Sequence, residues 1–374
     1  MKFTEVNPIS IKIQKLINKS ILNTIKKKDF ILGKNVNKFE KKFSQLTNSK
    51  FAIGCATGTD ALTLALKVLN LKSRDEIIIP GMSYISTGLS VILNNYKLKF
   101  ADINKDTGLI CLKSIKKNLT NRTKVIIPVN LYGQKVDIRS LRQIVGKKIF
   151  IIEDSAQSHF SSSCKNCKRN NHLNCYKSEK SHKYADLSCF SFYPSKNLGA
   201  YGDGGIITTD NKFFYTKLLA LRNLGSIKKN VHQLEGLNSR LDTIQASILL
   251  EKIKYAPLHN NYRRKISSYY DRKLSSIKDV KLTLTDPGSS RHLYVIRVKK
   301  REKLVDFLKK NKISVQFHYP YSLNKTGALK NKIKKINLKN SEIWAKECLS
   351  LPLYPFMKIS DANKVVSKIK KFYS

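Results

Sequence analysis

The sequence predicts an α/β protein, with a mostly parallel sheet in a large domain and a smaller C-terminal α+β domain. Between about residues 51 and 210, short apolar runs alternate with helical segments. The apolar runs are rich in Ile and Val, which is typical of strands buried on both faces, as in parallel sheets. From about Tyr262 the chain changes to a tyrosine-rich helix, two further strand-like runs and a last lysine-rich helix.

The elements of the large domain follow in order. The first two units have the order strand, turn, helix: "FAIGCATGTDALTLALKVLN" and "DEIIIPGMSYISTGLSVILNN". Further strands are expected at "KLKFADIN", "KVIIPVNLYG" and "KKIFIIEDSAQ", and a long amphipathic helix at "SRLDTIQASILLEKI". Because ligands collect at the carboxyl ends of parallel strands, the residues just after each strand are the candidates for function.

The small domain is expected to hold strands at "HLYVIRV" and "SVQFH", with a helix between them. We place the boundary after residue 255, so that 1–255 form the large domain and 256–374 the small one.

The chain is strongly basic, with 71 Lys and Arg against 26 Asp and Glu and a formal charge of +45. Such a charge can indicate a nucleic-acid partner. Here the excess is spread along the chain and comes mostly from lysine, whereas a nucleic-acid surface would cluster arginine with aromatic residues. We therefore expect no nucleic-acid partner, although the charge should attract acidic ligands such as nucleotide diphosphates.

The N-terminal residues, the lengths of the apolar runs and the cysteine count favour a cytoplasmic protein. The first 20 residues alternate polar and apolar side chains without the continuous apolar core of a signal peptide. No apolar run approaches membrane-spanning length, so no membrane partner is expected. Seven cysteines, an odd number in a chain of 374 residues, indicate free thiols in a reducing compartment.

Two of the strand ends could meet a ligand. After the first strand, Thr57, Gly58 and Thr59 precede a helix, and small residues there can expose backbone N–H groups to an anion. The alternative is that Thr59 and Asp60 only cap the helix. After the second strand, Tyr84 could be a platform for a flat ring or an ordinary packing residue.

Asp154 and Lys196 are the residues with the clearest chemistry. Asp154 ends a fully apolar strand and needs a partner such as a protonated ring nitrogen, unless it caps a helix. Lys196 lies between two apolar runs in "CFSFYPSKNLGAYGDGGIITTD". A lysine removed from water has a lowered pKa and forms Schiff bases with carbonyls such as pyridoxal phosphate (PLP). PLP also needs a phosphate cradle, a ring platform and an acid, which Thr57–Thr59, Tyr84 and Asp154 offer.

With these motifs the chain resembles the DegT/DnrJ/EryC1/StrS family of PLP-dependent nucleotide-sugar aminotransferases over nearly its full length. The matching motifs are "FILGKNVNKFEKKF", "GCATGTDALTLAL", "VNLYGQKVDI", "IIEDSAQS", "FSFYPSKNLGAYGDGG", "LRNLGS" and "LNSRLDTIQASILL". The resemblance implies the PLP-dependent transferase fold of type I.

The resemblance also implies roles for single residues. Lys196 would bind PLP covalently and move protons, Asp154 would hold the pyridine nitrogen, and Gln157 would approach the phenolic oxygen of the ring. The remaining cofactor residues would be Gly58, Thr59 and Ser191 on the phosphate, and Tyr84 against the ring. Asn238 would reach the phosphate in the other subunit, which implies a homodimer with shared active sites.

The implied reaction transfers an amino group from glutamate to a keto group of a nucleotide-linked sugar. Lysine at position 196 favours this reaction over dehydration, because dehydratase relatives carry histidine there. Several motifs are similar to enzymes acting on dTDP-linked 3-keto-6-deoxy sugars, in which His318 and Tyr319 could line the sugar pocket. His318 could instead be a strand-end residue. Two alternatives stay open: a UDP-sugar C4 aminotransferase and a non-catalytic, nucleic-acid-binding regulator on the same fold.

A cysteine-rich insertion over about 161–186 departs from the family pattern. Its spacing, C-x2-C-x4-H-x2-C, could hold zinc, but an ordinary insertion is the simpler interpretation, and we expect no metal. The four candidate ligands are Cys164, Cys167, His172 and Cys175.

Overall fold

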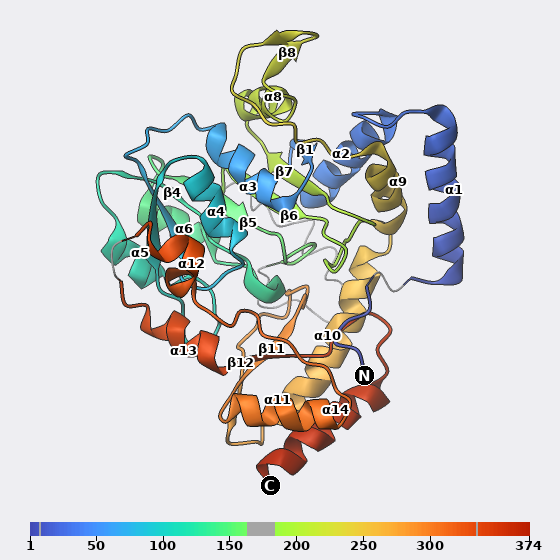
Figure 1. Ribbon diagram of the computed structural model, residues 1–374, viewed down its shortest axis with the longest axis vertical. Helices are drawn as coiled ribbons and strands as arrows, with labels where there is room; N and C mark the ends of the chain where they lie inside the picture. The colour runs from blue at the N-terminus through green and yellow to red at the C-terminus, as the bar shows by residue number, and fades with distance from the viewer. Residues whose placement is uncertain (7–8, 163–183, 334–335) are drawn as a thin grey trace.

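The strands of the large domain form one central sheet of seven strands (Figure 1). The computed structural model describes residues 1–6, 9–162, 184–333 and 336–374. The strand order is β1-β7-β6-β5-β4-β2-β3. The strands are β1 (Phe51–Cys55), β2 (Glu76–Pro80), β3 (Lys97–Ala101), β4 (Thr123–Ile126), β5 (Phe150–Asp154), β6 (Leu187–Ser191) and β7 (Gly205–Thr209).

The expected mostly parallel sheet is confirmed. The pairs β2–β3, β2–β4, β4–β5 and β5–β6 are parallel, whereas β7 runs antiparallel to both β1 and β6. Every residue of β2, β6 and β7 is buried, which explains why these strands have continuous apolar runs.

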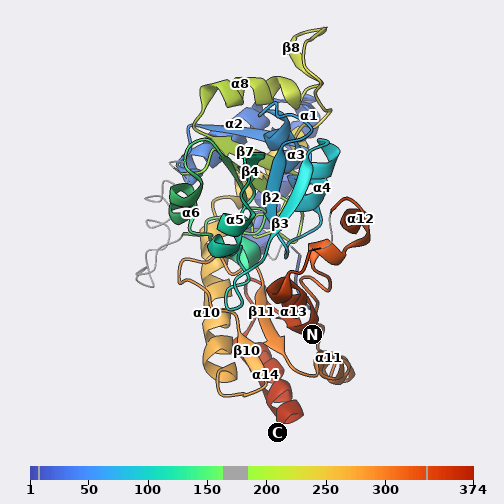
Figure 2. The ribbon, with the colours of Figure 1, turned by 90° about the vertical axis from the view of Figure 1, so that its left-hand side faces the viewer.

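Helices cover both faces of this sheet (Figures 1 and 2). α3 packs against α4, β6 and β7, and its residues 61–66 are all buried, so its first turn is held firmly at the sheet. α1 and α2 pack against α9. The helices of this part are α1 (Ile11–Lys27), α2 (Lys34–Thr47), α3 (Gly58–Lys67), α4 (Ser86–Leu93), α5 (Leu112–Asn118), α6 (Ile138–Val145), α8 (Lys212–Leu221) and α9 (Thr243–Lys252).

A second, antiparallel sheet of three strands lies at the C-terminal end of the molecule (Figure 1). Its apolar core includes Tyr270, Ile296, Leu304 and Ile369. The strands are β10 (Val280–Leu282), β11 (Tyr294–Val298) and β12 (Cys348–Leu351), and the helices around them are α10 (Ala256–Leu274), α11 (Arg301–Lys310), α12 (Gly327–Lys330), α13 (Lys339–Glu347) and α14 (Ile359–Tyr373). A separate α+β unit is thus present, and the boundary at residue 255 stays a prediction.

The prediction of a strand at "SVQFH" is wrong. This segment makes a single bridge, between Gln316 and Ser350, and Ser314 N donates instead to Met1 O. The N-terminal residues occupy the place where the rest of a ladder would form, since Leu353 N donates to Phe3 O. The strands that complete the sheet, β10 and β12, are only three and four residues long, too short to give a clear pattern.

The β8–β9 hairpin (Ser226–Lys228 and Val231–His232) projects from the opposite end of the molecule (Figure 2). Among the described residues, no helix is both long and apolar enough to cross a membrane.

Candidate active site

One cavity, of about 610 Å³, brings the predicted strand-end residues together. It lies at the carboxyl ends of β5 and β6 and at the first turn of α3, and the C-terminal unit forms its other wall. Its lining includes Gly58, Thr59, Tyr84, Asp154, Gln157, Ser191, Lys196, His318 and Tyr319.

Lys196 reaches this cavity through a tight turn after β6. Its backbone N–H donates to Tyr193 O at 2.9 Å. Glycine is required at Gly199, because an added Cβ would lie 2.3 Å from the carbonyl oxygen of Pro194. Burial lowers the pKa of Lys196 from 10.5 to about 8, an effect that the charge of Asp154 opposes. At pH 7 about a tenth of this amine is then uncharged and nucleophilic, far more than for a lysine of ordinary pKa.

Asp154 is the acid that faces this lysine. Its Oδ2 accepts a hydrogen bond from Thr87 Oγ1 at 2.8 Å, and its Oδ1 accepts one from Ala156 N at 3.2 Å. Burial raises the pKa of Asp154, while the two hydrogen bonds and the charge of Lys196 lower it. A turn follows Asp154 rather than a helix, so the alternative of a helix-capping aspartate does not apply.

The first turn of α3 forms a cradle beside β6. Thr57 is the N-cap residue, and its Oγ1 accepts from Asp60 N at 2.9 Å. The alternative that Thr59 and Asp60 cap this helix is therefore wrong; Thr59 Oγ1 bonds Ser86 Oγ at 2.7 Å. A Cβ added to Gly58 would lie 2.5 Å from Ser191 Cβ. The N–H groups at this helix start have no acceptor within the helix and can bind an anion.

Gln157 and the aromatic residues form the wall opposite the cradle. Gln157 Oε1 accepts from Tyr132 N, and its Nε2 donates to Tyr319 OH, both at 2.7 Å. The ring centroids of Tyr84 and Tyr319 are 5.8 Å apart, and 57% of Tyr84 is exposed, so Tyr84 is not a core residue. His318 Nδ1 lies 2.8 Å from Ser350 Oγ, and burial, aided by the charge of Lys196, lowers the pKa of His318 to about 4.

Asn238 does not join this group. It is exposed and lies outside the cavity of its own chain. The four residues of the zinc hypothesis lie outside the described residues.

Three residues of this site were missed by sequence reasoning. Thr87 is fully buried and donates to Asp154, whereas Arg263 and His292 line the cavity on the side toward the C-terminal unit. Thr87 lies in the first turn of α4. Arg263 lies in the polar run "NNYRRK", where no sequence pattern distinguishes a ligand-facing arginine from a solvated one.

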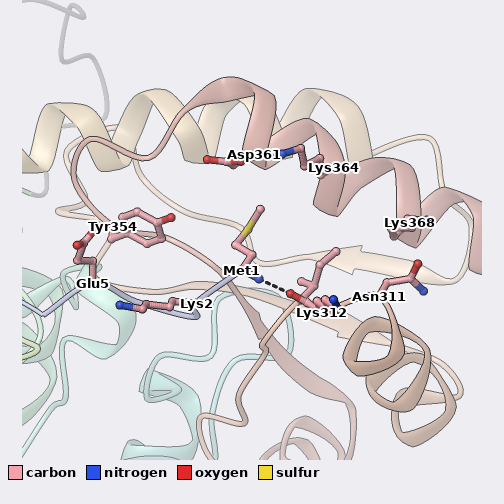
Figure 3. Close-up of a pocket in the computed structure, with 10 residues that line it drawn as sticks. Met1, Lys2, Glu5, Asn311, Lys312, Tyr354, Asp361, Lys364 and Lys368 are labelled. Carbon is pink, nitrogen blue, oxygen red and sulfur yellow. Dashed lines mark hydrogen bonds and ion pairs between the residues drawn. The ribbon is translucent and has the colours of Figure 1, made fainter.

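A second hollow, of about 420 Å³, lies between the N-terminus and α14 (Figure 3). Its lysines, among them Lys312 and Lys368, are accompanied by Glu5 and Asp361. It has neither a buried nucleophile nor an anion cradle, so we place the active site in the first cavity.

PLP fits the residues of the first cavity. The helix start at Gly58 offers a phosphate site that a side chain would fill, Lys196 offers an amine of lowered pKa, and Asp154 offers an acid for a ring nitrogen. The fold and this site define a PLP-dependent aminotransferase.

Comparison with known proteins agrees with this class. The chain is 35% identical, over 99% of both chains, to a dTDP-3-amino-3,6-dideoxy-alpha-D-galactopyranose transaminase of Aneurinibacillus thermoaerophilus. It is 32% identical, over 96% of both chains, to a UDP-2-acetamido-2-deoxy-3-oxo-D-glucuronate aminotransferase of Pseudomonas aeruginosa. The crystal structure of S. venezuelae DesV, in complex with a ketimine intermediate, superposes with a TM-score of 0.91 at 27% identity, covering 100% of this chain and 98% of that one. The chain belongs to the DegT/DnrJ/EryC1/StrS aminotransferase family, whose model matches residues 11–370.

Proposed function

We propose that this aminotransferase moves an amino group from glutamate to a keto group of a nucleotide-linked sugar, with a dTDP-linked 3-keto-6-deoxy sugar as the acceptor. The observation that carries the proposal is the Lys196–Asp154 pair in one cavity, in a chain 35% identical over its whole length to a transaminase of a dTDP-linked 3-amino sugar.

Each cavity residue then has a task. Bound PLP supplies a carbonyl that accepts an amino group and a ring that takes up electrons. Asp154 would keep a proton on the ring nitrogen, and Gln157 Nε2 would face the phenolic oxygen. Gly58, Thr59 and Ser191 would hold the phosphate. The amine of Lys196 would carry a proton to and from the reacting carbon.

Tyr84 offers an exposed ring against the cofactor, and on the acceptor side His318 and Tyr319 offer a wall for the sugar. His318 is neutral near pH 7, since its pKa is about 4, and can accept or donate a hydrogen bond to a hydroxyl. The overall charge of +45 favours the approach of a nucleotide diphosphate.

We further propose a homodimer in which Asn238 completes the phosphate site of the partner subunit, because this residue is exposed outside its own cavity. The apolar side chains that α1 leaves exposed, Ile11, Leu16, Leu22 and Ile25, supply a surface for such a contact. A cytoplasmic location is supported by the described cysteines, which are all free thiols.

A UDP-linked acceptor is the second candidate, favoured by the 32% identity to an aminotransferase named for a UDP-linked 3-oxo sugar. Incubation with glutamate and a panel of dTDP- and UDP-linked 3-keto and 4-keto sugars, read by mass spectrometry, separates the candidates. Lys196→Ala is the negative control. We expect an amino sugar from the dTDP-linked 3-keto sugar. Inertness toward the whole panel, with salt-sensitive binding of DNA or RNA, would instead favour the regulator.

A further inference from the structure

Arg263 is a buried cation, and no acid among the described residues neutralises it. Only 4% of the residue is exposed, on α10 beneath the cavity. Its Nη1 donates to the backbone oxygens of His292 and Leu353, both at 3.1 Å. Its Nε is buried without an acceptor, and across the described part of the chain no carboxylate lies within ion-pair distance of the guanidinium.

The titratable neighbours of Arg263 do not supply the missing charge. His292 Nδ1 lies 2.9 Å from Asn197 Oδ1. The amide nitrogen of Asn197 donates to Asn260 and Ser290, so its oxygen accepts from His292. Burial, together with the charges of Lys196 and Arg263, holds the pKa of His292 well below its usual range, so this ring is neutral. Burial lowers the pKa of His259 to about 4, aided by Arg263.

The guanidinium itself keeps its charge. Burial lowers the pKa of Arg263 only to about 10, well above neutral pH. A buried charge with hydrogen-bonding capacity left over is costly unless an anion compensates it. Because Arg263 lines the cavity of Lys196, a ligand can bring that anion.

We infer that Arg263 receives a carboxylate of the amino donor. The inference rests on the proposed function and names the group that recognises glutamate. Each half of the reaction brings its reacting carbon to Lys196, and the carboxyl carbons of glutamate lie one and three bonds from that carbon. The proposed acceptor, a 3-keto-6-deoxy sugar, presents neutral hydroxyls there, and its diphosphate lies beyond the ring. A planar guanidinium can bind a carboxylate with two parallel hydrogen bonds.

The test uses the PLP-loaded enzyme and measures two ligands separately. The absorbance change of the cofactor on addition of glutamate gives an apparent dissociation constant and a limiting rate, and calorimetry gives the affinity for dTDP. The variants are Arg263→Gln and Arg263→Lys. The matched control is Arg264→Gln, a neighbour on α10 that is outside the cavity.

In Arg263→Gln we expect the apparent affinity for glutamate to fall about tenfold to a hundredfold, with dTDP affinity changed less than twofold. Arg263→Lys should recover part of the loss, and Arg264→Gln should resemble the wild type. Unchanged glutamate affinity, or a matching loss for dTDP together with a lowered melting temperature, overturns the inference. The proposed function can fail independently of this inference. In that case the wild-type enzyme accepts the amino group from glutamate but transfers it to no nucleotide sugar.

Discussion

Lys196 is one of 71 basic residues, and its chemistry depends on the place that the chain gives it. The turn after β6 removes it from bulk water, and burial lowers its pKa to about 8. Asp154 lies close enough to oppose that shift and has its own pKa raised by burial. Burial therefore raises the pKa of the acid and lowers the pKa of the amine within one cavity.

This pKa predicts how the cofactor-free protein takes up PLP. Only the uncharged amine attacks a carbonyl, and with a pKa of about 8 its fraction rises about tenfold per pH unit below pH 8 and then levels off. Stopped-flow absorbance after mixing with PLP measures this rate. A rate that keeps rising up to pH 10 would mean that the lysine has its ordinary pKa.

The hydrogen bond from Thr87 to Asp154 predicts in which direction the pH profile of activity moves when the bond is removed. Its hydrogen bond lowers the pKa of Asp154, so in Thr87→Val the pKa of Asp154 rises and the carboxylate is protonated at higher pH. The acidic limb of the kcat/KM profile should then move to higher pH, and Thr87→Ser, which keeps the hydroxyl, should not move it. A Thr87→Val profile that coincides with the wild type or moves to lower pH contradicts the assignment.

The cofactor residues that line the cavity and were found from sequence share one property: they end or follow strands of the large sheet, or lie at the start of the next helix. Asp154 and Lys196 each interrupt apolar runs, and that contrast made them visible. Thr87 and Arg263 lie inside helices with polar neighbours, and only tertiary packing brings Thr87 to Asp154 and Arg263 to the cavity. Sequence reasoning could not detect them because helical spacing does not say which polar side chain meets a ligand.

At the scale of elements, the anion cradle forms where α3, which follows β1, begins beside the end of β6. The buried length of α3 fixes its first turn beside the end of β6, and this order of elements follows directly from the sequence pattern. The small sheet is less predictable, because the N-terminal segment contributes to it from more than 300 residues away, as Ser314 N donates to Met1 O. The hydrophobic pattern of a short sequence segment cannot predict such a long-range contact.

The cradle predicts the effect of one added methyl group. In Gly58→Ala the new Cβ would lie 2.5 Å from Ser191 Cβ, so the helix start must shift from the strand end. We expect PLP affinity to fall about fivefold to 150-fold, from an overpacking cost of about 1–3 kcal/mol. Gly327→Ala is the control, since nothing lies within 4 Å of its added Cβ. Equal PLP affinity of both variants, in a fluorescence titration, would exclude Gly58 from the cradle.

At the scale of the whole molecule, the exposed Asn238 predicts complementation between subunits. Lys196→Ala and Asn238→Asp should each be nearly inactive as pure proteins. Mixed and allowed to exchange subunits, they should form hybrid dimers with one intact site, giving about a quarter of the wild-type activity. Mass photometry checks the dimer. No recovery of activity in a mixture with demonstrated exchange would contradict shared sites.

The most direct test of the central claim is to find the lysine that binds PLP. Borohydride reduction of the PLP-loaded protein makes the bond between lysine and cofactor permanent, and peptide mass spectrometry then locates it. Because the chain is rich in lysine, a label on one particular lysine distinguishes a specific PLP site from non-specific modification. The structure predicts that the label lies on Lys196 and is lost from the Lys196→Ala protein. A label that lies on another lysine, or a protein that takes up no PLP, would contradict it.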